Sequence, residues 1–252
     1  MTVALLGFDC STNPKKAGAA RGTWDGERAT IEEAFAGTAD AAGVLGRWMD
    51  DRPTGRPAVV AFDAPLGWPA ALGATLVVHA AGEPLPHAAN RLFRRATDDF
   101  VHRTLGKRPL DVGADRIART AAFALGVAGE LRAGRELPLL REPGPPADGG
   151  AGLIEVYPAA TLRSRGLALA GYKGTDRAKT AATRTALADR LAEDASLACG
   201  REALIASDDA FDAAVCVLAA ADFVAGRVHP PPADLSAETL RREGWIWFGP
   251  PG

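Results

Sequence analysis

The sequence predicts a mixed α/β fold in which a sheet opens with antiparallel strands, continues with parallel strands and is flanked by helices. Apolar runs that end in an aspartate, at 3–9 and 57–63, are typical of buried strands. Between them, residues 17–36 carry two weaker strand patterns joined by Asp25-Gly26, a common hairpin turn. A helical pattern over 39–49 then leads from the hairpin to the next strand, which indicates a helix covering the sheet.

The rest of the chain is expected to complete one domain over residues 1–252. No internal repeat or linker composition divides it. The later elements are expected in this order: a mainly helical insertion over about 69–141, a Pro/Gly loop over 142–150, a strand over 153–157, an amphipathic helix over 176–197, an apolar helix capped by Ser207 and running to about 225, and a short helix before the apolar end at 245–248.

Composition limits the class of protein. The 252 residues are 47% hydrophobic and 24% charged with a formal net charge of −2, so the chain is globular and has no overall attraction for nucleic acid or anionic membranes. The three cysteines form no CxxC pair, which argues against a disulfide framework or a thiolate zinc site and favours a reducing compartment. The N-terminus lacks the features of a signal peptide, and no apolar stretch approaches the roughly 20 residues that cross a bilayer. A cytoplasmic protein without a membrane partner is therefore expected.

Acidic residues occur where core strands end or would otherwise be apolar. Asp9 and Asp63 follow apolar runs, and Glu155 lies between Ile154 and Val156. The carboxyl ends of parallel strands line the crevice where open α/β sheets bind ligands. Carboxylates crowded there raise one another's pKa, and a cation relieves the repulsion. Hard oxygen ligands favour Mg²⁺ or Mn²⁺ as that cation.

A second pair of acids opens the late apolar helix. Asp209 and Asp212 are three residues apart, so they lie on one helix face and can point toward the acids at the strand ends. Two structural roles for these acids stay open: acids in a first helical turn favour the helix dipole, and a single aspartate at a strand end is often a turn residue. Asp208 is expected to face solvent or cap the helix.

Several segments resemble one known family across nearly the whole chain. The resemblance is to the predicted-nuclease family of RNase H fold catalogued as domain of unknown function 429. The segments run in family order and are GFDCS (7–11), AFDAPLGWP (61–69), RRATDDFVHR (94–103), IEVYPAA (154–160), GYKG (171–174), DDAFDAAVCVLAA (208–220) and EGWIW (243–247).

The resemblance implies an RNase H-like sheet and metal-dependent hydrolysis of nucleic acid. The RNase H-like superfamily, with the RuvC-type resolvases, places one acid on the first strand, one on the fourth strand, and one or two on a late helix. Asp9, Asp63, Asp209 and Asp212 occupy those places and are the expected metal ligands and catalytic residues. Glu155 is a further acid of the family's motif and is also an expected catalytic residue, either as a metal ligand or as a residue behind the ligands. The implied reaction is two-metal phosphodiester hydrolysis with Mg²⁺ or Mn²⁺.

Basic residues concentrate in the helical middle of the chain. Within RRATDDFVHR, the resemblance points to Arg95 and Asp98 as substrate-binding residues, and Lys173 beside a glycine is a further candidate for binding phosphate. A solvated surface with internal Arg–Asp pairs would produce the same pattern equally well. The basic residues over 91–119 are Arg91, Arg94, Arg95, Arg103, Lys107, Arg108, Arg116 and Arg119.

Two alternatives to a nuclease remain. An ATP-dependent small-molecule kinase of the actin/hexokinase kind shares the ancestral sheet, and GFDCST (7–12) faintly resembles its first phosphate loop. Against it, Asp63 is followed by Ala-Pro-Leu-Gly instead of a second Gly/Thr phosphate loop. A non-catalytic binding module that kept the fold is the other alternative. Neither a P-loop nor a GxGxxG motif is present.

Overall fold

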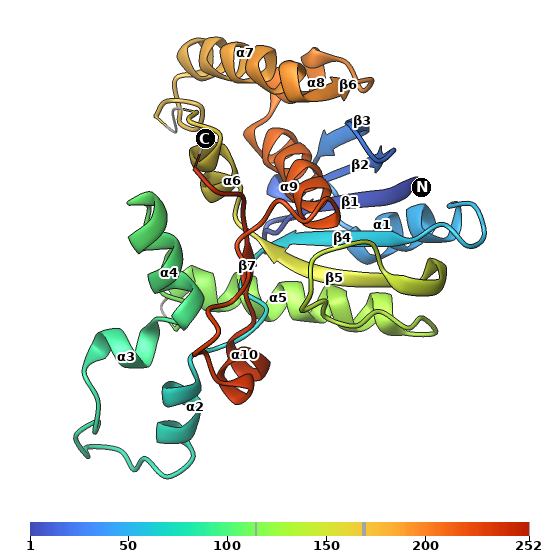
Figure 1. The fold of residues 1–252 in the computed structure, drawn as a ribbon. Coiled ribbons are helices and arrows are strands. Elements are labelled where there is room, and N and C mark those ends of the chain that lie inside the picture. The colour runs from blue at the N-terminus through green and yellow to red at the C-terminus, as the bar shows by residue number, and fades with distance from the viewer. Residues whose placement is uncertain (114, 168–169, 252) are drawn as a thin grey trace.

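Seven strands form one mixed sheet in the computed structural model, which describes residues 1–113, 115–167 and 170–251 but not the side chains of residues 115 and 116. The order of the strands across the sheet is β6-β3-β2-β1-β4-β5-β7 (Figure 1). Their bounds are β1 Val3–Asp9, β2 Gly18–Trp24, β3 Ala29–Ala36, β4 Ala58–Asp63, β5 Ala151–Val156, β6 Ala195–Leu197 and β7 Ile246–Trp247.

The directions of the strands confirm the predicted fold class. β1, β2 and β3 pair antiparallel, and β4, β5 and β7 then extend the sheet in parallel from β1. Because β1, β4 and β5 are parallel neighbours, their carboxyl ends reach the same edge of the sheet.

Helices cover both faces of the sheet. The α-helices are α1 Ala41–Asp50, α2 Ala70–Leu76, α3 Ala89–Phe93, α4 Ala96–Leu105, α5 Asp115–Arg132, α6 Pro158–Ser164, α7 Arg177–Asp194, α8 Arg201–Ala206, α9 Asp208–Val224 and α10 Ala237–Glu243; short 3-10 turns lie at Pro14–Lys16 and Ala147–Gly149. No described helix combines the length and the apolar character that spanning a membrane requires.

The side chains of β1 point alternately to the two faces of the sheet, and the core therefore has two layers. Val3 and Leu5 pack with α9 in one cluster, whereas Leu6 and Phe8 pack with α1 and α5 in another. Figure 1 shows α9 across one face of the sheet and α5 along the other. The face on which a strand residue lies therefore follows from its position along the strand.

The region 69–141, expected to be a helical insertion, contains α2, α3, α4 and α5. In Figure 1, α2 and α3 project away from the sheet. α5 instead packs against the sheet, with Ala124, Val127 and Ala128 in the core. The later part of this region thus belongs to the main core.

The helix expected over 176–197 is shorter than predicted. α7 ends at Asp194, and Ala195–Leu197 forms β6, which pairs parallel with Ala29–Ile31 of β3. The free backbone groups at the edge of β3 favour the extended conformation there over one more helical turn. The cap at Ser207 agrees with the sequence, since its hydroxyl accepts hydrogen bonds from the amides of Asp209 and Ala210.

Candidate metal centre

Three carboxylates meet at the carboxyl edge of the sheet. Asp9 and Asp63 end the parallel strands β1 and β4 and are partners in register. Asp212 reaches them from α9. Each residue offers one oxygen, and these oxygens all lie within 4.8 Å of one another. We refer to Asp9, Asp63 and Asp212 as the acidic cluster.

The alternation of the strands places these acids on the face that α9 covers. In β1, Val3 and Leu5 pack on that face, and two further steps of two residues lead to Asp9. In β4, Val59 and Ala61 lie on the same face, so Asp63 continues their row. The helix that completes the core on this face is therefore also the element that brings in the third acid.

Two glycines allow α9 to lie close to the sheet. A Cβ atom on Gly7 would stand 2.2 Å from the carbonyl oxygen of Ala213, and one on Gly18 would stand 2.1 Å from that of Asp209. Both distances are far shorter than a van der Waals contact. The atoms that would be met belong to the backbone, so they cannot move away by a change of rotamer. The GFDCS segment thus combines a ligand candidate, Asp9, with the glycine that admits the helix.

We predict that Gly7→Ala lowers the free energy of unfolding by about 3 kcal/mol, because α9 must move off the sheet to make room for the methyl group. Gly126→Ala is the matched control: Gly126 lies within α5 and an added Cβ meets nothing within 4 Å. The control is expected to be neutral or up to about 1 kcal/mol more stable. Chemical denaturation measures both variants. Equal stability of Gly7→Ala and the wild type would contradict the close approach.

The acidic cluster crowds three carboxylates, of which Asp9 and Asp212 are buried and Asp63 is half-buried. Burial, then Asp212 and Asp63, raises the pKa of Asp9 well above its usual value. Burial and the neighbouring Asp212 raise the pKa of Asp63 to about 7. Burial also raises the pKa of Asp212, against the opposing effect of Lys173. In the part of the chain that the structure describes, no Lys or Arg forms an ion pair with Asp9 or Asp63. The cluster therefore favours a proton or a cation.

The raised pKa of Asp63 predicts a pH-dependent stability in the absence of divalent metal. The folded state keeps its proton up to about pH 7, whereas the unfolded state loses it near pH 4. The resulting stabilisation is complete below pH 4 and is lost as the pH rises through 7, and its size is on the order of 2–4 kcal/mol. In EDTA, the wild type should lose about 5 °C or more in Tm between pH 5 and pH 8 relative to Asp63→Asn. If Tm changed with pH in the same way for both proteins, the pH dependence could not come from Asp63.

Tyr172 and Lys173 contact the cluster from the GYKG segment. The hydroxyl of Tyr172 donates to Oδ1 of Asp212 at 3.2 Å, and Nζ of Lys173 forms an ion pair with Oδ2 of the same residue. Although burial lowers the pKa of Lys173, Asp212 raises it more, so the ammonium stays charged. Lys173 is about half exposed. It is thus a cation at the site that can also reach toward solvent.

Asp209, the fourth expected ligand, does not join the cluster. It lies half-buried in the first turn of α9, where burial and the neighbouring Asp208 raise its pKa to about 6. Asp208 is half-buried in the same turn. The predicted pair on one helix face therefore contributes Asp212 to the cluster and leaves Asp209 beside it.

Glu155 points away from the cluster. Its neighbours Ile154 and Val156 pack on the α9 face, so alternation directs Glu155 to the other face. There it is 2% exposed and forms a two-pronged ion pair with Arg95, at 2.7 and 2.8 Å. Its Oε2 also accepts from the amide of Leu66 at 2.9 Å, which fixes the loop that follows Asp63.

Arg95 is buried and fully engaged. Its five N–H groups donate to both carboxylate oxygens of Asp98, both of Glu155 and the carbonyl of Glu243. Asp98 in turn accepts from the amide of Arg95 at the start of α4. These expected substrate-binding residues thus come together with Glu155, and in this arrangement Arg95 has no N–H left for a phosphate.

Glu243 is also joined to Arg95, and through it to Asp98 and Glu155, although no role was predicted for it from the sequence. It accepts from the amides of Ala70 and Ala96 at 2.8 and 2.7 Å and so ties α2 and α4 to the C-terminal segment. The sequence feature that could have pointed to Glu243 is its place at the start of the EGWIW segment. We refer to Arg95, Asp98, Glu155 and Glu243 as the buried ionic network.

Two residues of the basic segment differ in their place relative to the acidic cluster. Lys107 lines a cavity together with Asp63 and Asp212. Arg94 is instead paired with Asp111 at 3.1 Å. The side chain of Arg116 lies outside the described residues.

Two cavities adjoin the cluster. One has a volume of about 260 Å³ and the other about 240 Å³, and both are lined by Asp63, Tyr157 and Lys173. They therefore lie side by side at the carboxyl edge of the sheet. A ligand that filled both would pass over Asp63.

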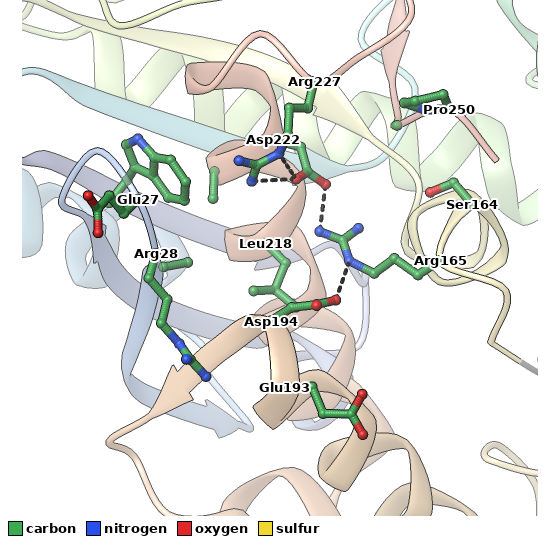
Figure 2. A pocket seen from close by; sticks show the side chains of 14 residues that line it. Glu27, Arg28, Ser164, Arg165, Glu193, Asp194, Leu218, Asp222, Arg227 and Pro250 are labelled. Atoms are coloured by element: carbon green, nitrogen blue, oxygen red, sulfur yellow. Dashed lines mark hydrogen bonds and ion pairs between the residues drawn. The ribbon is translucent and has the colours of Figure 1, made fainter. Parts of the chain in front are cut away.

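A larger cavity, about 680 Å³, lies at the opposite end of α9 and does not contain the cluster. Figure 2 shows Arg165 and Arg227 directed toward Asp222 in it. Arg165 pairs with Asp222 at 2.6 Å and Arg227 pairs with it at 3.1 Å. Opposite charges are thus already matched there, in contrast to the acidic cluster.

Comparison with known proteins gives one match. The model of the family described as "Protein of unknown function (DUF429)" matches residues 7–236, which is most of the chain. Neither the curated proteins nor the solved structures contain a match. The matched range includes the acidic cluster and most of the sheet. The chain therefore belongs to the DUF429 family of proteins of unknown function.

Proposed function

We propose that this protein is a nuclease that depends on Mg²⁺ or Mn²⁺ and hydrolyses phosphodiester bonds of nucleic acid by a two-metal mechanism. The convergence of Asp9, Asp63 and Asp212 carries the proposal. Three carboxylates, of which Asp9 and Asp212 are buried and Asp63 is half-buried, have one ion-paired lysine among them and are a set of hard oxygen donors, the ligand type that these ions prefer. Such ions, when bound, polarise a phosphodiester and activate water.

The placement of the acids supports a nuclease of RNase H-like fold. One acid ends the first strand, one ends the fourth, and one lies on the late helix α9. The order of strands, antiparallel and then parallel outward from β1, is compatible with that fold. This is the arrangement that the sequence resemblance implies.

The chain's own residues have separate tasks in the proposed reaction. Asp9, Asp63 and Asp212 would hold the ions through their carboxylate oxygens. Lys173 and Lys107 lie at the same cavity and neutralise the negative charge of the substrate phosphate. The buried ionic network holds the loop after Asp63 through the hydrogen bond from the amide of Leu66 to Glu155, and therefore positions this ligand.

The experiment is a cleavage assay with end-labelled single-stranded and duplex oligonucleotides, of DNA and of RNA. We expect cleavage with Mg²⁺ or Mn²⁺, none in EDTA, and none for Asp9→Asn. Asp51→Asn is the matched control, since Asp51 is an exposed residue that follows α1. No cleavage of any substrate by the wild type, together with stabilisation by ATP, would instead favour the kinase alternative.

A further inference from the structure

The two cavities at the acidic cluster differ in chemistry. The larger, which we call the apolar cavity, is lined by Pro65, Leu110, Ile117, Val156 and Ile246 in addition to the residues it shares. The smaller, which we call the polar cavity, is lined by two lysines, Lys107 and Lys173, together with Asp63 and Asp212. A ligand that fits both has an apolar part and an anionic part, joined above Asp63.

The size of the apolar cavity limits its occupant. Its volume of about 260 Å³ is below the roughly 300 Å³ at which pockets for drug-sized ligands begin. One flat ring system fits such a space, whereas a stacked base pair does not. Leu110, which lines this cavity, is 62% exposed. It offers an apolar surface to whatever enters.

Tyr157 joins the two cavities. Its half-buried ring lines both of them and directly follows β5, at the same edge of the sheet as Asp63. Aromatic side chains in nucleic-acid sites stack on unpaired bases, and this stacking tolerates any base because every base has a π face. A ring at the junction is therefore suited to hold a base beside the phosphate to which it is attached.

Three polar side chains that line the apolar cavity but not the polar one, Arg95, Glu155 and Cys10, are occupied within the protein. Arg95 and Glu155 pair with each other, and the thiol of Cys10 lies 3.7 Å from the carbonyl oxygen of Phe8, to which it donates. These groups consequently offer little for reading the edge of a base. The apolar cavity would therefore recognise a base by its shape and by stacking.

We propose that the apolar cavity binds one unstacked nucleobase of a single-stranded or locally opened nucleic acid, while the polar cavity binds the adjoining phosphate over the acidic cluster. This inference rests on the proposed nuclease function and names its substrate class. Duplex that cannot open is excluded, because a base must leave its stack to enter. Discrimination among the four bases is weak.

Binding is measured separately from cleavage to test the proposal. Fluorescein-labelled single-stranded oligonucleotides are titrated with the full chain in Ca²⁺, an ion that takes the same oxygen ligands, and their anisotropy is recorded. A single abasic residue is moved along the oligonucleotide. For the wild type, we expect one abasic position to weaken Kd by about 5- to 150-fold, the range that stacking of one base provides.

Two variants close the apolar cavity or change its exposed surface. Ile117→Trp fills it, and Leu110→Ser makes an exposed side chain polar without adding a charge that would repel the oligonucleotide. Both should weaken binding of the intact oligonucleotide and should show no further loss with the abasic one. Leu235→Trp, in a separate cavity with Phe100 and Trp245, is the matched control and should bind as the wild type does. Thermal unfolding verifies that each variant is folded.

The outcomes separate the two proposals. A flat abasic scan, or wild-type affinity in both cavity variants, overturns the base-binding cavity even where Mg²⁺-dependent cleavage is present. Abasic-sensitive binding without cleavage in Mg²⁺ or Mn²⁺ supports the cavity and refutes the nuclease. Absence of both binding and cleavage overturns both.

Discussion

Replacing Asp63 with asparagine is expected to reduce the proposed metal-dependent hydrolysis by about a thousandfold or more, equivalent to about 4 kcal/mol of transition-state free energy. The same variant should unfold at a higher temperature than the wild type in EDTA at pH 8. Both effects follow from the place of Asp63 beside two other carboxylates. The variant loses a ligand oxygen for metal, and it also removes a charge whose crowding costs stability unless a cation is bound.

The combination of lost activity and gained stability distinguishes a ligand from a structural residue. A structural aspartate would lose stability on replacement, as buried polar groups normally do. Asp51→Asn should change neither property, because Asp51 is exposed. Steady-state kinetics and differential scanning calorimetry supply the two readouts. Unchanged turnover in Asp63→Asn would remove this residue from the site.

Arg95→Ala is expected to destabilise the fold by about 3–5 kcal/mol, because it leaves Asp98 and Glu155 buried without their cation. Arg95→Lys should recover only part of this loss, since an ammonium cannot supply five donors in the planar arrangement of a guanidinium. Arg91→Ala is the matched control, since Arg91 is exposed, and should stay within about 0.5 kcal/mol of the wild type.

This prediction decides between two roles for Arg95. The sequence resemblance implies that it binds substrate, whereas its contacts make it part of the buried ionic network. Urea denaturation together with kinetics on the same preparation separates the roles. A variant with wild-type stability and a raised KM would restore Arg95 as a substrate-binding residue.

Much of the sheet was predictable because its signals are local. Apolar runs marked β1 and β4, and Asp25-Gly26 marked the hairpin of β2 and β3. β6 was not predictable in this way, because three residues pair with β3 only after α7 has brought them there. Its strand conformation is a result of tertiary contact.

The candidate site was only partly predictable. Asp9 and Asp63 follow from strand ends that share an edge, but the choice of Asp212 over Asp209 depends on how α9 is rotated against the sheet. The closeness of α9 at Gly7 fixes that rotation, and a single sequence does not reveal it. The direction of Glu155, by contrast, could have been predicted from the sequence. Its neighbours Ile154 and Val156 are both apolar core residues, so a strand residue between them points to the opposite face.

The most direct test of the metal centre is the anomalous signal of manganese in crystals grown with Mn²⁺. We expect a peak with oxygens of Asp9, Asp63 and Asp212 at about 2.0–2.6 Å, and its loss in crystals of Asp9→Asn. An absence of manganese at saturating concentration, or a peak held by other residues while the three carboxylates stay apart from it, would contradict a metal centre at the acidic cluster.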